Sequence, residues 1–310
     1  MARWERSPAA DGRSALVRAS GCSDARRMTI VVGVDGSAPA QHALDWAIRE
    51  ARVHDCALQL VHGAVVVGGH AITPSTARLV TKASALLLDR VLAVARTEAP
   101  DLAITAALVR GPAALGLIDA SADADLLVVG SHGHGGATSF VLGSVADACV
   151  RHAAVPVAVI RPEAVAQSGG AVVVGVDGSE GSLAALRWAR CEAFARGSGL
   201  DVIHAWDAGF STELAAIAVG VTEEIERDAR ATLHSAVELT AGVGTEAPTE
   251  VLVHDFPERA LLEAANDATL LVVGSRGRGG FTSLLLGSVS RSCVHRAGCP
   301  VVVVREPATG

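Results

Sequence analysis

The chain has 310 residues, and at about 150 residues per domain this length predicts two domains. Half of the residues are apolar and 19% are charged, which excludes a disordered or fibrous chain. The formal net charge is −7 and aromatic residues make up 3% of the chain. This composition argues against nucleic acid or an anionic membrane surface as the main partner.

Residues 1–27 are polar and rich in arginine, which predicts a disordered extension or sequence upstream of a second start at Met28. No apolar run approaches the roughly 20 residues that a membrane-spanning helix needs, and we expect a cytoplasmic protein. The six cysteines form no C-x-x-C pair. Their spacing therefore predicts buried, reduced thiols, with neither a disulfide framework nor a metal site.

The sequence repeats itself from residue 28 onward. Val-Val-Gly-Val-Asp-Gly-Ser stands at 31–37 and again 142 residues later, and residues 130–161 match 274–305 at 18 of 32 positions without a gap. Apolar segments alone would not keep Gly, Ser, Thr and Pro in register, so we infer a tandem duplication. The predicted organisation is an extension over 1–27, a first domain over 28–162, a linker over 163–170 and a second domain over 171–306.

In each copy, short runs of Val, Ile and Leu alternate with stretches at helical spacing. The first copy has expected strands at 29–34, 57–62, 103–109, 126–129 and 155–160. The second has them at 171–176, 200–204, 249–254, 270–273 and 301–304. Such strands, separated by helices, predict an α/β fold of two tandem doubly wound, Rossmann-like domains, each with a five-stranded parallel sheet. The last apolar strand of each copy would be a bare edge, so we expect these two strands to pair within the chain.

A glycine-rich loop follows the fourth strand of each copy. Both loops fit G-x2-G-x9-G-[S/T], through Gly130, Gly133, Gly143 and Ser144 in the first and Gly274, Gly277, Gly287 and Ser288 in the second. Further glycines, Gly135 and Gly136 in one loop and Gly279 and Gly280 in the other, lie inside the motif.

Glycine lets successive N–H groups line one concavity, and a following helix N-terminus favours phosphate. The serine after the last glycine either caps that helix or donates its hydroxyl to phosphate. The alternative is a loop that is rich in glycine only for packing.

These residues resemble the universal stress protein family, and the resemblance extends over nearly the whole chain from Met28. Its ATP-binding members share this loop and an Asp after the first strand, and their fold resembles that of the adenine nucleotide alpha hydrolases. The resemblance implies that the loop residues hold ribose and phosphates. It also implies that the two domains are related by a pseudo-two-fold axis, with a homodimer as a further alternative.

By the same resemblance, Asp35 and Asp177 lie beside adenine or ribose, next to Gly33 and Gly175. Gly63 and Ala205 match the position whose backbone meets the adenine edge. The two aspartates also fit a turn and cap for the next helix, and the two roles are compatible. After the third strand, Gly111 in the first copy is replaced by Asp255 in the second, where an acid would bind a ribose hydroxyl or repel phosphate.

His132 and His134 in the first loop match Arg276 and Arg278 in the second. Arginine cannot ligate a metal but donates well to phosphate, so we favour phosphate contact over a solvated loop or a metal pair. Because histidine normally titrates near pH 6.5, the first copy is expected to bind nucleotide more tightly as the pH falls toward about 5.5.

The sequence carries no Walker, kinase or G-x-S-x-G signature, and no catalytic or metal-ligating residue is assigned. We expect an ATP-binding, nucleotide-dependent regulator of a stress response, with Mg²⁺ accompanying ATP through its phosphates and an adenine nucleotide as partner. Two alternatives stay open. One is a slow ATPase or adenylyl-transfer enzyme, and the other is a structural tandem that has lost its ligand.

Overall fold

A computed structural model describes residues 28–64, 73–133, 142–162, 169–207, 219–242, 247–278 and 285–306. The predicted extension over 1–27 and most of the predicted linker lie outside these ranges. In the described residues, no helix combines the length and the apolarity needed to cross a membrane.

The first half alternates strands and helices. Its elements are β1 (Thr29–Gly33), α2 (Ala38–Val53), β2 (Ala57–Ala64), α3 (Pro74–Glu98), β3 (Ile104–Arg110), α4 (Ala113–Ala120), β4 (Leu126–Gly130), α5 (Ser144–His152) and β5 (Val157–Ile160).

The second half repeats this order. Its elements are β6 (Val172–Gly175), α6 (Glu180–Arg196), β7 (Leu200–Trp206), α8 (Val219–Leu239), β8 (Thr249–His254), α9 (Pro257–Ala264), β9 (Leu270–Gly274), α10 (Ser288–Arg296) and β10 (Val301–Val304). All ten predicted strands are present. The second strand of each copy is longer than predicted, because its pairing with the third continues to Ala64 and Trp206.

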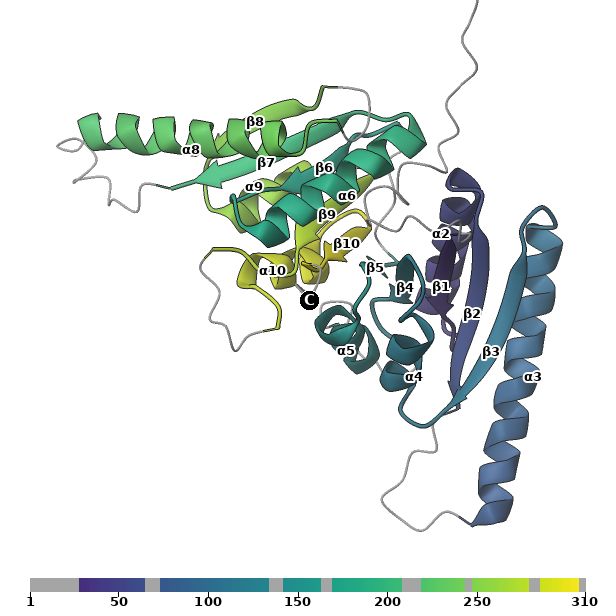
Figure 1. The fold of residues 1–310 in the computed structure, drawn as a ribbon. Coiled ribbons are helices and arrows are strands. Elements are labelled where there is room, and N and C mark those ends of the chain that lie inside the picture. The colour runs from purple at the N-terminus through teal and green to yellow at the C-terminus, as the bar shows by residue number, and fades with distance from the viewer. Residues whose placement is uncertain are drawn as a thin grey trace, which may run out of the picture.

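The strands form one sheet in the order β3-β2-β1-β4-β5-β10-β9-β6-β7-β8, which reads as the same pattern from either edge. Within each half all pairs are parallel. The central pair β5–β10 is antiparallel, with Ala158 opposite Val302. The edge-strand pairing expected from the sequence is therefore present, and Figure 1 shows the halves joined there. The predicted fold class, two doubly wound parallel-sheet units in tandem, is confirmed.

Each face of the sheet has its own apolar core, because alternate side chains of a strand point to opposite faces. Ile30 and Val32 of β1 belong to the core that includes residues of α2 and α6, while Val31 belongs to the core that includes residues of α5 and α10. Both cores contain residues of both halves. Strands buried on both faces account for the nearly continuous apolar runs in the sequence.

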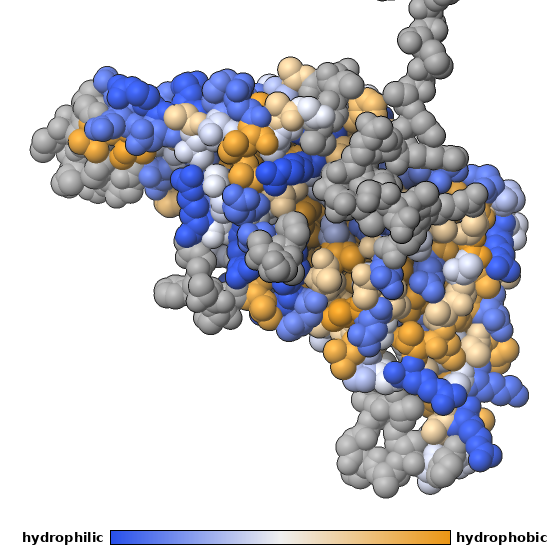
Figure 2. Space-filling model, in the orientation of Figure 1, coloured by the Kyte–Doolittle hydropathy of each residue, from blue (hydrophilic) through white to orange (hydrophobic). Residues whose placement is uncertain are grey.

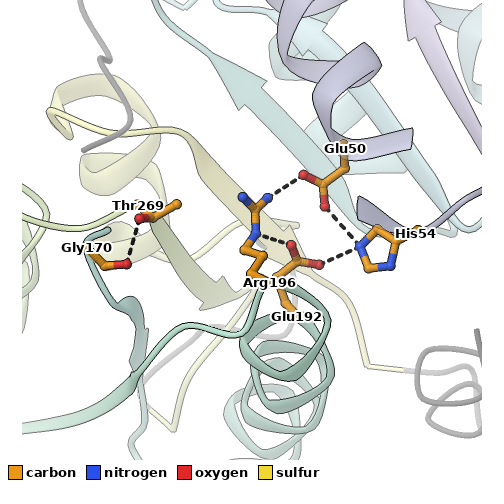
Figure 3. Close-up of polar contacts among 6 residues, drawn as sticks. All are labelled: Glu50, His54, Gly170, Glu192, Arg196 and Thr269. Atoms are coloured by element: carbon orange, nitrogen blue, oxygen red, sulfur yellow. Dashed lines mark hydrogen bonds and ion pairs between the residues drawn. The ribbon is translucent and has the colours of Figure 1, made fainter. Parts of the chain in front are cut away.

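A buried cluster of four ionisable side chains joins the two halves at the ends of α2 and α6 (Figure 3). Nε2 of His54 lies 3.1 Å from Oε1 of Glu50 and 3.0 Å from Oε2 of Glu192. Arg196 donates from Nη2 to Glu50 and from Nε to Glu192. The side chains of Glu50 and Glu192 are 1% and 0% exposed, so these contacts replace water. Nearby, Thr269 donates to the Gly170 carbonyl, which fixes the second half where the predicted linker ends.

The cluster is balanced when His54 carries a proton, with two carboxylates facing two cations. Burial alone would lower the pKa of His54, but its hydrogen bonds to Glu192 and Glu50 outweigh this and raise it to about 10. Burial and the charge of Glu192 raise the pKa of Glu50 to about 7. Burial opposes ionisation of Glu192 too, but the Arg196 charge and His54 hold its pKa below the usual range.

The five cysteines within the described residues are buried thiols, which confirms the burial that the sequence predicted. Burial raises the pKa of the thiols of Cys56, Cys149, Cys293 and Cys299 to about 12. At neutral pH these thiols are protonated, and a protonated thiol is a poor nucleophile.

Candidate functional site

The glycine loops begin at the carboxyl ends of β4 and β9 and lead to α5 and α10. Gly143 and Gly287 are the residues before these helices, and both have extended backbones. Because both N-cap residues are glycines, neither helix has a side-chain cap from that position. The sequence left open whether Ser144 and Ser288 are caps. They are instead the first helical residues, and the N-cap positions are Gly143 and Gly287.

Asp35 and Asp177 hold the turns between the first strand and first helix of each half. In both, Oδ1 accepts from the backbone N–H and the hydroxyl of the serine two residues later, Ser37 or Ser179. These serines in turn cap α2 and α6. The turn-and-cap role expected as one reading of the motif is therefore present in both copies.

The second carboxylate oxygen of each aspartate faces its glycine loop. A Cβ on Gly133 would lie 2.5 Å from Oδ2 of Asp35, and one on Gly277 would lie 2.2 Å from Oδ2 of Asp177. The same oxygen of Asp177 accepts the backbone N–H of Arg278 at 2.9 Å. Burial alone would raise the pKa of Asp177, but the hydrogen bonds from Ser179 and Arg278 lower it, so this carboxylate is held ionised.

A repeated histidine, missed in the sequence analysis, supports each turn. Nδ1 of His62 donates to the Val34 carbonyl at 2.6 Å, and Nδ1 of His204 donates to the Val176 carbonyl at 2.7 Å. Each carbonyl belongs to the residue just before the aspartate. The signal was available, because both histidines lie 28 residues after their acceptors in the two copies.

A cavity of about 460 Å³ lies at this edge of the second half. Its polar lining comes from Asp177, Ser182, Arg276, Ser288 and Ser290, and its glycines are the predicted Gly175, Gly274, Gly277 and Gly287. Its apolar lining, apart from Ala205, escaped prediction and consists of Val176, Ile203, Pro257, Leu261, Val273 and Val289. The cavity therefore combines polar side chains and glycines with apolar side chains.

Two residues predicted for this site do not line the cavity. Asp255 accepts from the N–H of Phe256 and pairs with Arg259 at 3.4 Å. The backbone N–H of Arg278 donates to Asp177, but the guanidinium of Arg278 lies against Gly178. Arg276, its neighbour in the loop, lines the cavity instead. Gly279 and Gly280 lie outside the described residues.

The first half has the matching strand-end geometry. A Cβ on Gly130 would lie 2.8 Å from the Pro39 backbone, which explains a glycine where α2 begins against β4. Gly63 is held as tightly, because its Cβ would lie 2.7 Å from Cα of Ala113, and Gly33 packs against Leu117. His134, Gly135 and Gly136 lie outside the described residues. Gly111 has a φ of +99° and lines a different cavity, on the α3 side of the sheet.

Comparison with known proteins adds to this geometry. The model of the universal stress protein family matches residues 27–161 and again residues 170–305. The chain belongs to the universal stress protein family. Its relatives include a universal stress protein of Mycolicibacterium smegmatis, 38% identical over 292 residues that make up 89% of this chain and 96% of that one. A universal stress protein of Mycobacterium tuberculosis is 35% identical over 90% of this chain and 97% of that one.

Solved structures share the architecture of this tandem universal stress protein. A universal stress protein from Archaeoglobus fulgidus superposes with a TM-score of 0.66 over 90% of this chain and 98% of that one, at 21% identity. A protein of unknown function from Pseudomonas aeruginosa gives a TM-score of 0.63 over 91% and 93% of the two chains, at 18% identity. At these identities the likeness shows the fold alone.

Proposed function

We propose that each half of this universal stress protein binds ATP at the carboxyl edge of its sheet, and that occupancy regulates a partner in a stress response. The observation that carries the proposal is the 460 Å³ cavity of the second half, where apolar walls meet the uncapped N-terminus of α10. A volume of this size suits one small ligand.

The polar and the apolar lining of the cavity suit the phosphates and the base of a nucleotide. The backbone N–H and the hydroxyl of Ser288, together with Arg276, would hold the phosphates, while the Gly287 N–H donates to the Ser275 carbonyl and fixes the loop. Ile203, Pro257 and Leu261 offer apolar walls for a purine, with Asp177 beside the ribose or base. Ser144, the residue after Gly143 at the start of α5, would hold the phosphates in the same way in the first half.

We further propose that ATP is bound without efficient hydrolysis. Asp177 is the one carboxylate among the described residues that line the cavity, and hydrogen bonds from its own turn occupy Oδ1. Phosphoryl transfer needs a positioned water and charge neutralisation, usually with several carboxylates for Mg²⁺. Any Mg²⁺ would then arrive with the phosphates, beside Asp35 or Asp177.

Calorimetric titration with ATP tests binding, with thermal unfolding as the second readout. At 100 times the dissociation constant, ATP adds about 2.7 kcal/mol to the free energy of unfolding. The variant Gly287→Val should lose binding in the second half and Gly143→Val in the first. Gly199→Ala is the control, because its Cβ would meet nothing closer than 3.7 Å. If no nucleotide co-purifies and ATP leaves the melting temperature unchanged, the structural tandem that has lost its ligand is the better description.

Chromatography of ADP and AMP after long incubation with ATP tests the absence of catalysis. We expect no more product from the wild-type protein than from the Gly143→Val/Gly287→Val double variant. Turnover that the double variant abolishes would establish the slow ATPase or adenylyl-transfer alternative.

A further inference from the structure

A second cavity, of about 740 Å³, lies in the first half on the α3 side of the sheet. Its lining comes from the ends of β2 and β3, the turn after β3 and the first turns of α3: Ala64, Ala77, Arg78, Thr81, Lys82, Ala85, Arg110, Gly111 and Pro112. Small side chains form most of the wall, and Arg78, Lys82 and Arg110 are its charged groups. In Figure 2 hydrophilic residues, drawn blue, lie beside apolar ones at the lower end of α3.

The charged groups among the described lining residues are all positive. No acidic residue lines the cavity among the described residues, and its three cations form no ion pair or hydrogen bond with the part of the chain that the structure describes. Two other cations near α3 are paired: Arg52 binds Asp101 at 2.9 Å, and Arg96 donates to the Ile104 carbonyl. Arg90 of α3 also has no such partner in the described residues but lies outside the cavity, so what sets Arg78, Lys82 and Arg110 apart is that they line one space.

The duplication supplies an internal comparison, because the second half has different residues at the matching place. Ala64 pairs with Arg110 in the sheet register, and the matching pair is Trp206 with His254. The rings of Trp206 and His254 stack with centroids 4.2 Å apart and planes 10° apart. Two rings thus stand where the first half has a methyl group and a guanidinium.

Two further positions of the lining also differ in charge. Leu88, Ala95 and Ala99 are buried at the spacing of Ala229, Ala236 and Thr240, which aligns α3 with α8 at an offset of 141 residues. In this alignment Lys82 corresponds to Glu223, and after the third strand Gly111 corresponds to Asp255. The open, cationic cavity is thus specific to the first half within the described residues.

We propose that this cavity of the first half binds an organic phosphate with a small apolar body, at a site separate from the glycine loop. Arginine and lysine bind phosphate through charge-assisted hydrogen bonds, and three of them approach one space here. The alanines and Pro112 would contact the apolar body, and the volume falls in the range of small-molecule sites.

Calorimetry with three probes tests the proposal: 1-naphthyl phosphate, inorganic phosphate and 1-naphthol. We expect naphthyl phosphate to bind more tightly than either of the other two, because only it uses both the cations and the apolar wall. If naphthol binds as tightly, or if naphthyl phosphate does not bind at millimolar concentration, the proposal fails.

Two variants place the binding in the structure. Lys82→Glu puts the second half's residue at an exposed position and should weaken naphthyl phosphate by about tenfold or more, the loss of one charge-assisted hydrogen bond. The double variant Ala64→Trp/Arg110→His transplants the ring pair of the second half and should abolish binding. Arg90→Ala, on the same helix but outside the cavity, is the control and should bind as the wild type does.

Circular dichroism and the melting temperature show whether each variant is folded. If the double variant is unfolded, the affinity of Lys82→Glu for naphthyl phosphate alone tests the proposal. Binding that is the same in Lys82→Glu and in the wild type would place the probe elsewhere, for example at a glycine loop, and would overturn the proposal.

Discussion

Glu50 and Glu192 occupy equivalent positions in the two copies, 142 residues apart, and converge on the same two cations in one buried cluster. The cation one turn after each glutamate is His54 in the first copy and Arg196 in the second, at the same offset. The guanidinium of Arg196 also lies 6.0 Å from the ring centre of Trp46, which is one turn before Glu50. The local two-fold axis of the molecule therefore relates unlike cations.

The variant His54→Arg should change how stability depends on pH. His54 faces Glu50, Glu192 and Arg196, and its pKa is raised from 6.5 to about 10 in the folded chain. A raised pKa stabilises the folded state fully below pH 6.5, and this stabilisation is lost as the pH rises through 10. The wild-type free energy of unfolding should fall by a few kcal/mol over that window, while His54→Arg keeps its charge and loses much less. Urea unfolding at pH 6.5, 8 and 10 measures the difference, and parallel curves would contradict the assignment.

Glu192→Ala should be strongly destabilising. It leaves His54 and Arg196 with a single carboxylate in a buried position, and breaking a buried ion pair from one side costs about 3–5 kcal/mol. The control is Glu238→Ala on α8, where the side chain is 71% exposed. Chemical unfolding at pH 7.5 compares the two variants, and a loss below about 1 kcal/mol for Glu192→Ala would mean that the cluster adds little to stability.

Gly274→Ala should destabilise the second half without touching a charge. Its Cβ would lie 2.8 Å from the Gly181 backbone, which cannot move aside without shifting the start of α6. Overpacking of this kind costs about 1–3 kcal/mol. Gly199→Ala has room and should be neutral or slightly stabilising. Thermal unfolding of both variants tests the contrast, and equal melting temperatures would refute it.

The buried thiols should resist modification in the folded protein. Burial raises the pKa of Cys191 to about 11 and those of the other four described cysteines to about 12. In a Cys22→Ser variant, which removes the cysteine outside the described residues, Ellman's reagent at pH 8 should detect almost no thiol. In 6 M guanidinium it should detect five, and rapid reaction of the native variant would show that a thiol is accessible.

The fold was predictable because its signals are local and repeated. Runs such as 126–129 and 270–273 are apolar at every position, as strands covered on both faces must be, and the duplication confirmed the register of each motif. The need for glycine at the strand ends was also predictable. Where a strand end contacts the start of a helix there is no room for a Cβ, as at Gly130 and Gly274.

What escaped prediction depends on contacts between distant segments. Leu261 and Pro257 line the second-half cavity because α9 packs across the ends of β6 and β7, and no spacing in the sequence indicates this. The cluster around Glu192 was missed for the same reason, since glutamates on helices are usually solvated. Asp255 was expected at the nucleotide on position alone, but its own turn and Arg259 engage the carboxylate.

The antiparallel junction of β5 and β10 has a consequence for how this protein can evolve. In a homodimer, any change beside the axis is made twice and must tolerate its own copy. Here one polypeptide supplies both sides, and the tether keeps the correct neighbour at high effective concentration. His54 can therefore stand at the position equivalent to Arg196. In the same way, the first half can have a cavity where the second half has the stacked rings of Trp206 and His254. Because the two halves are covalently linked, equivalent positions in them need not carry the same residue.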